Sequence, residues 1–270
     1  MMLFEMLSYP FLVRAFVVGV LVSLCAALLG ASLVLKRFSM IGDGLSHVGF
    51  GALAIASALG VAPLAVAVPV VVAAAVLLLR ISQSGKVRGD AAVALISSGA
   101  LAIGVLIISL TDGSNTNISN YMFGSILTIS SSDAVLSVIL CAAVLVVFTL
   151  FYPRIFAVTF DETFARATGT KAEGYNMLLA ILTAVTVVLG MRMMGALLIS
   201  SLIIFPALSS MRVFRSFRSV TVCSAVLAVC CFVAGMTASY ALETPSGASV
   251  VAVNILAYCG FALAGKLLGK

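Results

Sequence analysis

Charged residues and tryptophan are scarce in this sequence. Only 9% of its 270 residues are charged, one residue is a histidine, and none is a tryptophan. A soluble domain of this length needs far more charged surface, so the composition excludes one. Hydrophobic residues instead make up 63% of the chain, and the mean hydropathy is +1.28. These values indicate a polytopic membrane protein.

Several functional motifs are also absent. No G-x-x-x-x-G-K-[ST] loop is present, so any ATP-driven activity would need a separate ATPase subunit. The six cysteines have no C-x-x-C spacing, which argues against a thiolate metal cluster. The net charge of +6 is not accompanied by a cluster of basic and aromatic residues, so no nucleic-acid partner is expected.

Hydrophobic segments with few charges recur along the whole chain, and most approach the length of about 20 residues that crosses a bilayer. They predict an all-α membrane helical bundle of about eight or nine transmembrane helices, the lower number applying if one short segment is re-entrant. We expect a single transmembrane domain over residues 1–270. The segments cover residues 15–35, 44–60, 62–79, 91–111, 134–152, 174–191, 193–211, 219–241 and 248–265.

The basic residues predict the orientation, because Lys and Arg concentrate in cytoplasmic loops. If nine segments cross and the N-terminus is outside, only Arg14 and Arg192 of the 15 basic residues lie outside. The positive net charge is then a consequence of topology. An outer loop is expected at about 111–133.

The longest cytoplasmic connection, 152–176, is long enough to contain a helix. Asp161 is expected to start this helix and Gly169 to end it. Phe160, Phe164 and Ala165 would form an apolar contact edge. Two interpretations stay open from the residues alone: an amphipathic surface helix, or a docking helix for a cytoplasmic partner.

The only histidine, His47, stands four residues after Asp43 at the start of an apolar segment. Positions i and i+4 of a helix share a face about 6 Å apart, so one carboxylate oxygen and one imidazole nitrogen could bind the same transition-metal ion. The alternative is that Asp43 caps the helix N-terminus, that Ser46 is a further backbone partner, and that His47 only hydrogen-bonds to Asp43. Both interpretations are compatible with the residues.

A family resemblance bears on this choice. The stretch "VLKRFSMIGDGLSHVGFGALAIA", with its G-D-x-x-S-H motif, resembles the signature of the ABC-importer permeases that take up zinc, manganese or iron. "YMFGSIL" is similar to that family's outer loop, "FDETFARATGTKAEGYN" to its cytoplasmic coupling segment, and "MRMMGALLISSLIIFPALSS" to a late span. The resemblance covers nearly the whole chain in the same order.

The resemblance implies a multi-pass permease subunit of a bacterial cell membrane, not an enzyme. It implies a homodimer surrounded by lipid, a cytoplasmic ABC ATPase and an extracytoplasmic metal-binding protein as partners. Asp43 and His47 match the family's metal-contacting pair. Asp161, Glu162, Ala165 and Gly169 match its coupling segment, which covers about 154–173 here.

The resemblance is closest to the zinc-uptake members, because glycine follows Asp43 and an "FG" pair, Phe50-Gly51, comes shortly after His47-Val48. Zinc is therefore the expected cargo, with manganese or iron as alternatives, and no permanently bound cofactor is expected. A stand-alone secondary cation carrier could use the same Asp/His pair. A membrane metalloenzyme is less well supported, because one histidine leaves too few ligands and no general base.

Overall fold

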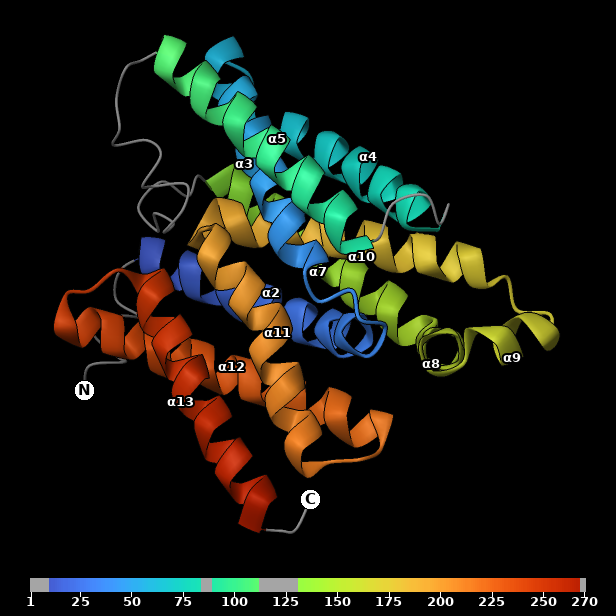
Figure 1. The fold of residues 1–270 in the computed structure, drawn as a ribbon. Helices are drawn as coiled ribbons and strands as arrows, with labels where there is room; N and C mark the ends of the chain where they lie inside the picture. Colours follow the sequence, from blue (N-terminus) through green and yellow to red (C-terminus); the bar gives the residue numbers. More distant parts are fainter. Residues whose placement is uncertain (1–9, 84–88, 112–130, 268–270) are drawn as a thin grey trace.

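The computed structural model describes residues 10–83, 89–111 and 131–267, and all regular structure in these ranges is helical (Figure 1). The predicted all-α fold is therefore confirmed for this part of the chain. The predicted outer loop lies almost entirely outside the described residues. The helices are α2 (Pro10–Leu35), α3 (Ile41–Leu59), α4 (Pro63–Gln83), α5 (Gly89–Thr111), α7 (Ser131–Leu150), α8 (Tyr152–Phe160), α9 (Glu162–Ala167), α10 (Ala172–Met194), α11 (Ala196–Val213), α12 (Phe217–Leu242) and α13 (Ser246–Leu267).

Eight of these helices are long and apolar enough to cross a membrane. They are α2, α4, α5, α7, α10, α11, α12 and α13. The protein is therefore a multi-pass membrane protein. The helix that does not meet this description is α3, which has 19 residues and has Asp43 and His47 near its start.

Although α3 is more polar, it lies inside the bundle and packs extensively against α5. A Cβ atom built on Gly44 would lie 2.5 Å from Val93, and one on Gly51 would lie 2.8 Å from the carbonyl oxygen of Ala100. Both residue numbers increase along this contact, so α3 and α5 run parallel. Since α5 is one of the eight helices able to cross a membrane, α3 runs in the same direction through the bundle. The sequence predicted eight or nine transmembrane helices, and α3 is the helix on which the count depends.

The centre of the bundle is formed by α2, α10 and α11, whose membrane-crossing windows are 67%, 67% and 61% buried. In Figure 1, α3, α4 and α5 lie on one side of this centre, and α12 and α13 lie on the other. One continuous hydrophobic core joins residues of these groups. The helix α3 packs directly against two of these central helices, α10 and α11.

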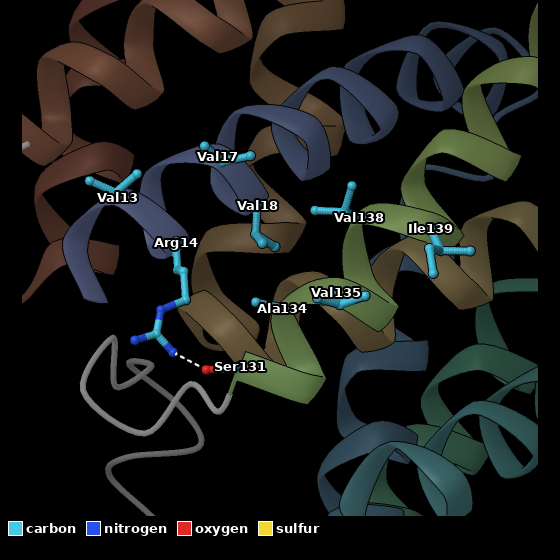
Figure 2. A pocket seen from close by; sticks show the side chains of 9 residues that line it. All are labelled: Val13, Arg14, Val17, Val18, Ser131, Ala134, Val135, Val138 and Ile139. Carbon is cyan, nitrogen blue, oxygen red and sulfur yellow. Dashed lines mark hydrogen bonds between the residues drawn. The ribbon is translucent and has the colours of Figure 1, made fainter. Parts of the chain in front are cut away.

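The two basic residues predicted to lie outside are found at the same end of the bundle. Arg14 donates a hydrogen bond to Ser131 over 2.6 Å, and Arg192 lies 3.4 Å from the Asp133 carboxylate. Figure 2 shows the Arg14–Ser131 contact at one end of a groove of about 350 Å³ between α2 and α7. The rest of this groove is apolar, lined by residues such as Val17, Val135 and Ile139. It therefore offers a surface for lipid chains and no set of metal ligands.

At the opposite end, the connection 152–176 contains two helices where the sequence predicted one. The additional helix, α8, has Pro153 in its first turn, where a missing backbone N–H costs nothing. Its apolar face is buried through Ile155 and Val158, and the ring of Phe156 lies 5.1 Å from that of Phe217. The following helix, α9, projects beside α8 at the edge of the bundle (Figure 1).

Candidate metal site and coupling segment

Asp43 and His47 lie one turn apart near the beginning of α3. The helix begins at Ile41, so Asp43 is its third residue and lies where a negative charge is favoured by the helix dipole. The distance between His47 Nε2 and Asp43 Oδ2 is 3.7 Å. The predicted i, i+4 pairing of the two side chains is therefore present in the fold.

The capping interpretation of Asp43 is wrong. The N-cap position belongs to Met40, and no side chain caps this helix. The 3.7 Å separation is also too long for a hydrogen bond between His47 and Asp43. Ser46 does contact the backbone here, because its hydroxyl donates to the carbonyl oxygen of Asp43 over 2.7 Å.

The separation is suited to an ion held between the two side chains. Zinc–nitrogen and zinc–oxygen bonds of about 2.0–2.2 Å place two tetrahedral ligands about 3.3–3.6 Å apart, close to the observed spacing. One oxygen of Asp43 lies within hydrogen-bond distance of Ser200 on α11, whose hydroxyl is 3.2 Å from Oδ1 and also 3.2 Å from the carbonyl oxygen of Ala196. The carboxylate thus has an orienting partner and a second oxygen facing His47.

The burial pattern along α3 separates these two residues from their neighbours. From Ile41 to Ala54, Asp43 and His47 are the only residues that are not buried. Their side chains are 45% and 27% exposed. The rest of this stretch packs against α4, α5, α10 and α11. Within Ile41–Ala54, the open stripe of α3 therefore consists of the two residues that can bind a metal.

One chain alone supplies an incomplete ligand set. Among the described residues, no group of three or more His, Cys, Asp or Glu side chains is close enough to hold one ion. A closed zinc site usually has four protein ligands. The metal-binding role of Asp43 and His47 therefore stays a prediction that needs further ligands from water or from a second chain.

The predicted ends of the cytoplasmic helix agree with α9. Asp161 is its N-cap, and a carboxylate oxygen accepts a hydrogen bond from the backbone N–H of Phe164 over 2.9 Å. Gly169 follows the helix with a φ of +83°, a conformation that favours glycine. The local sequence signals for start and end were sufficient here because capping depends only on neighbouring residues.

The predicted apolar edge of this segment is only partly correct. Phe160 and Phe164 are 66% and 64% exposed and form an outward-facing pair. Ala165, in contrast, is fully buried and packs with Val158 and Ala172. The prediction that Ala165 belongs to this contact edge is therefore wrong, because the side of α9 on which Ala165 lies faces α8 and α10.

Glu162 lies on the side of α9 that faces the rest of the protein. Its carboxylate accepts hydrogen bonds from Lys36 over 3.2 Å, from Asn176 over 3.1 Å and from Arg166 over 2.7 Å. Burial raises the pKa of Glu162, but these three donors outweigh that effect and the net pKa is lowered. Its carboxylate is therefore ionised at neutral pH.

The Lys36 side chain is largely buried in this cluster, with only 8% of it exposed. Burial lowers its pKa, and the hydrogen bond and charge of Glu162 partly offset the change. Sequence reasoning used Lys36 only to orient the chain and did not single out Asn176 or Ser200. The available signals were weak: a lysine at the end of one span and single polar residues in two others.

Known proteins similar to this chain match it over most of their length. The manganese import system permease protein ScaB of Streptococcus gordonii is 26% identical over 251 residues, covering 93% of this chain and 90% of that protein. The probable iron transport system membrane protein of Haemophilus influenzae is 29% identical over 257 residues, covering 95% and 91%. The solved structure of PsaBC from Streptococcus pneumoniae in complex with Fab matches with a TM-score of 0.86 and 25% identity, covering 96% and 94%.

These similarities confirm the resemblance to metal-ion permeases of ABC importers that the motifs indicated. The model of the ABC 3 transport family matches residues 8–264, which include α3, the coupling segment and all the described spans except the last three residues of α13. This chain therefore belongs to the ABC 3 transport family.

Proposed function

We propose that the chain is the permease subunit of an ATP-driven importer of divalent transition metals, with zinc as the preferred cargo. The observation that carries this proposal is the open stripe of α3, which consists of Asp43 and His47. Membership of a transport family and the names of relatives that carry manganese or iron support the metal class. Two partly exposed ligands on an otherwise buried stretch of helix are well suited to a site that must release its ion.

The incomplete ligand set supports a homodimer. One chain supplies one carboxylate and one imidazole, so two chains related by a two-fold axis would supply four ligands to a central pore. An extracytoplasmic binding protein would deliver the metal to the outer face. Closure of the ATPase on the cytoplasmic side would then change the pore from outward-open to inward-open.

The energy source can be tested directly in proteoliposomes. Uptake should require the ATPase partner together with ATP, because the chain has no nucleotide-binding loop of the Walker type. It should be unaffected by an imposed proton gradient. Transport that follows the proton gradient without ATP would support the secondary-carrier alternative instead.

Zinc preference rests on ligand chemistry and on the zinc-like motif around Gly44 and Gly51. Sites with nitrogen and oxygen ligands bind Zn²⁺ more tightly than Mn²⁺ or Fe²⁺. Excess unlabelled Zn²⁺ should therefore inhibit uptake of radioactive metal more strongly than equal concentrations of Mn²⁺ or Fe²⁺. Stronger competition by Mn²⁺ or Fe²⁺ would contradict the zinc preference and favour the metal for which the relatives are named.

The exposed pair Phe160 and Phe164 is the proposed contact with the ATPase. We expect Phe164→Ala to reduce co-purification of the ATPase, because truncating a buried interface aromatic costs about 2 kcal/mol or more, which is roughly a 30-fold weaker affinity. The permease itself should remain folded, since this ring is 64% exposed. Pull-down followed by quantitative immunoblotting measures the effect.

Two matched variants make this test specific. Leu242→Ala removes a side chain that is 71% exposed at the end of α12 and should leave the ATPase bound. Ala165→Glu would place a charge in the packing between α8, α9 and α10, so it should lower the stability of the segment as well as the affinity. Normal ATPase binding by Phe164→Ala would exclude this face as the contact.

A further inference from the structure

We infer that Lys36 and Glu162 form the connection through which the coupling segment moves the metal-binding helix. This inference rests on the proposed function, because it assumes that α9 contacts an ATPase and that α3 contacts the metal. The two residues are 126 positions apart in the chain, yet Lys36 Nζ lies 3.2 Å from Glu162 Oε2. Lys36 and Glu162 are positioning residues in this account, since neither contacts the metal.

The two sides of α9 have separate contacts. Phe164, like Phe160 at the end of α8, points outward, whereas Glu162 contacts the end of α2 through Lys36 and the beginning of α10 through Asn176. Asn176 is buried and also accepts a hydrogen bond from Lys36. A force applied to the exposed rings by a partner would therefore reach Lys36 through a short set of hydrogen bonds.

The connection from Lys36 to α3 is short and rigid. Arg37 adopts a φ of +61°, and the N–H groups of Arg37 and Phe38 bond to the carbonyl oxygens of Val34 and Leu33 over 3.0 Å and 2.8 Å. This is the hydrogen-bond pattern of a Schellman motif, which closes the end of α2. The next helix begins at Ile41, and its third residue is Asp43. A displacement of Lys36 is thus passed to the end of α3 that holds the candidate metal ligands.

Electrostatics explains why this contact should hold during movement. A buried ammonium group without a partner is strongly unfavourable, and Lys36 is 8% exposed. The carboxylate of Glu162 is the charged group that the structure places beside it. Separating the two is costly, so α9 and the turn between α2 and α3 are expected to move together.

The test uses the permease purified with its ATPase, reconstituted in proteoliposomes with Zn²⁺ as the probe. Lys36→Met and Glu162→Gln should each lower the amount of metal transported per ATP hydrolysed by about tenfold, within the range typical of coupling between sites. Zinc affinity and ATPase co-purification should stay at wild-type levels. The double variant should be no worse than either single one, because the two residues act as one unit.

Two further variants separate positioning from a general structural role. Lys36→Arg keeps the positive charge and should restore most of the coupling. Glu173→Gln removes another carboxylate from the same segment. Glu173 lies 3.8 Å from Arg166, and this ion pair is more exposed than the Lys36–Glu162 pair, so the variant should leave the coupling unchanged. Wild-type coupling in both Lys36→Met and Glu162→Gln, or loss of zinc binding or ATPase assembly in them, would overturn the inference. Absence of ATP-dependent uptake by the wild-type protein would instead contradict the proposed function.

Discussion

Metal uptake should be lost when Asp43 is replaced by Asn or His47 by Ala. The first change replaces the carboxylate of the open stripe of α3 by an uncharged amide, and the second removes its imidazole, which lies 3.7 Å from that carboxylate. Loss of an outer-shell partner typically costs about 10–100-fold in metal affinity, and loss of a direct ligand should cost at least as much. Uptake of radioactive zinc into proteoliposomes that contain the complete transporter measures the effect.

The structure also predicts a graded effect at Ser200. Its hydroxyl lies 3.2 Å from Asp43 Oδ1 and orients that carboxylate without occupying the position of a ligand. Ser200→Ala should therefore reduce uptake by about tenfold, which is less than the loss in the ligand variants. This order of effects would distinguish a metal site from a helix that only needs a polar residue.

A matched control is available on the parallel helix. Asp90 lies in the first turn of α5, as Asp43 does in α3, and it is exposed. Asp90→Asn changes the same chemical group at a similar helix position, so it should leave uptake near the wild-type level. If the Asp43 and His47 variants transported as well as Asp90→Asn, the pair would have no role in metal transport.

The second large effect is expected at Gly30, where α2 approaches the backbone of α11. A Cβ atom at this position would lie 2.1 Å from the carbonyl oxygen of Ile203, far inside van der Waals contact. Gly30→Ala should therefore force the two central helices apart at a cost of about 3 kcal/mol or more, at the upper end of typical overpacking. The expected result is low yield and loss of the monodisperse peak after mild heating, measured by size-exclusion chromatography of a fluorescent fusion.

Gly260 provides the comparison, because a Cβ atom there would have no neighbour within 4 Å. It is an exposed residue inside α13, so Gly260→Ala should be neutral or stabilising by up to about 1 kcal/mol through helix propensity. The same chemical change would then have opposite effects on two membrane helices. Equal thermal stability of the two variants would contradict the close approach of α2 and α11.

The amino-acid sequence by itself determined the features that depend on short stretches of chain. Hydropathy located the spans, the basic residues assigned Arg14 and Arg192 to one end, and helical spacing paired Asp43 with His47. Local capping signals predicted the start of α9 after Asp161 and its end before Gly169. These features could be predicted because membrane insertion, helix periodicity and capping act over one helix or less.

Only the tertiary structure decided which side of each helix is covered. It placed Ala165 in the interior and left Phe164 exposed, although the two are adjacent in sequence. It brought Ser200 to Asp43 and Lys36 to Glu162, across 157 and 126 positions of chain. In the membrane, hydrophobicity does not distinguish a helix face that meets lipid from one that meets protein, so these contacts depend on how the helices pack in three dimensions.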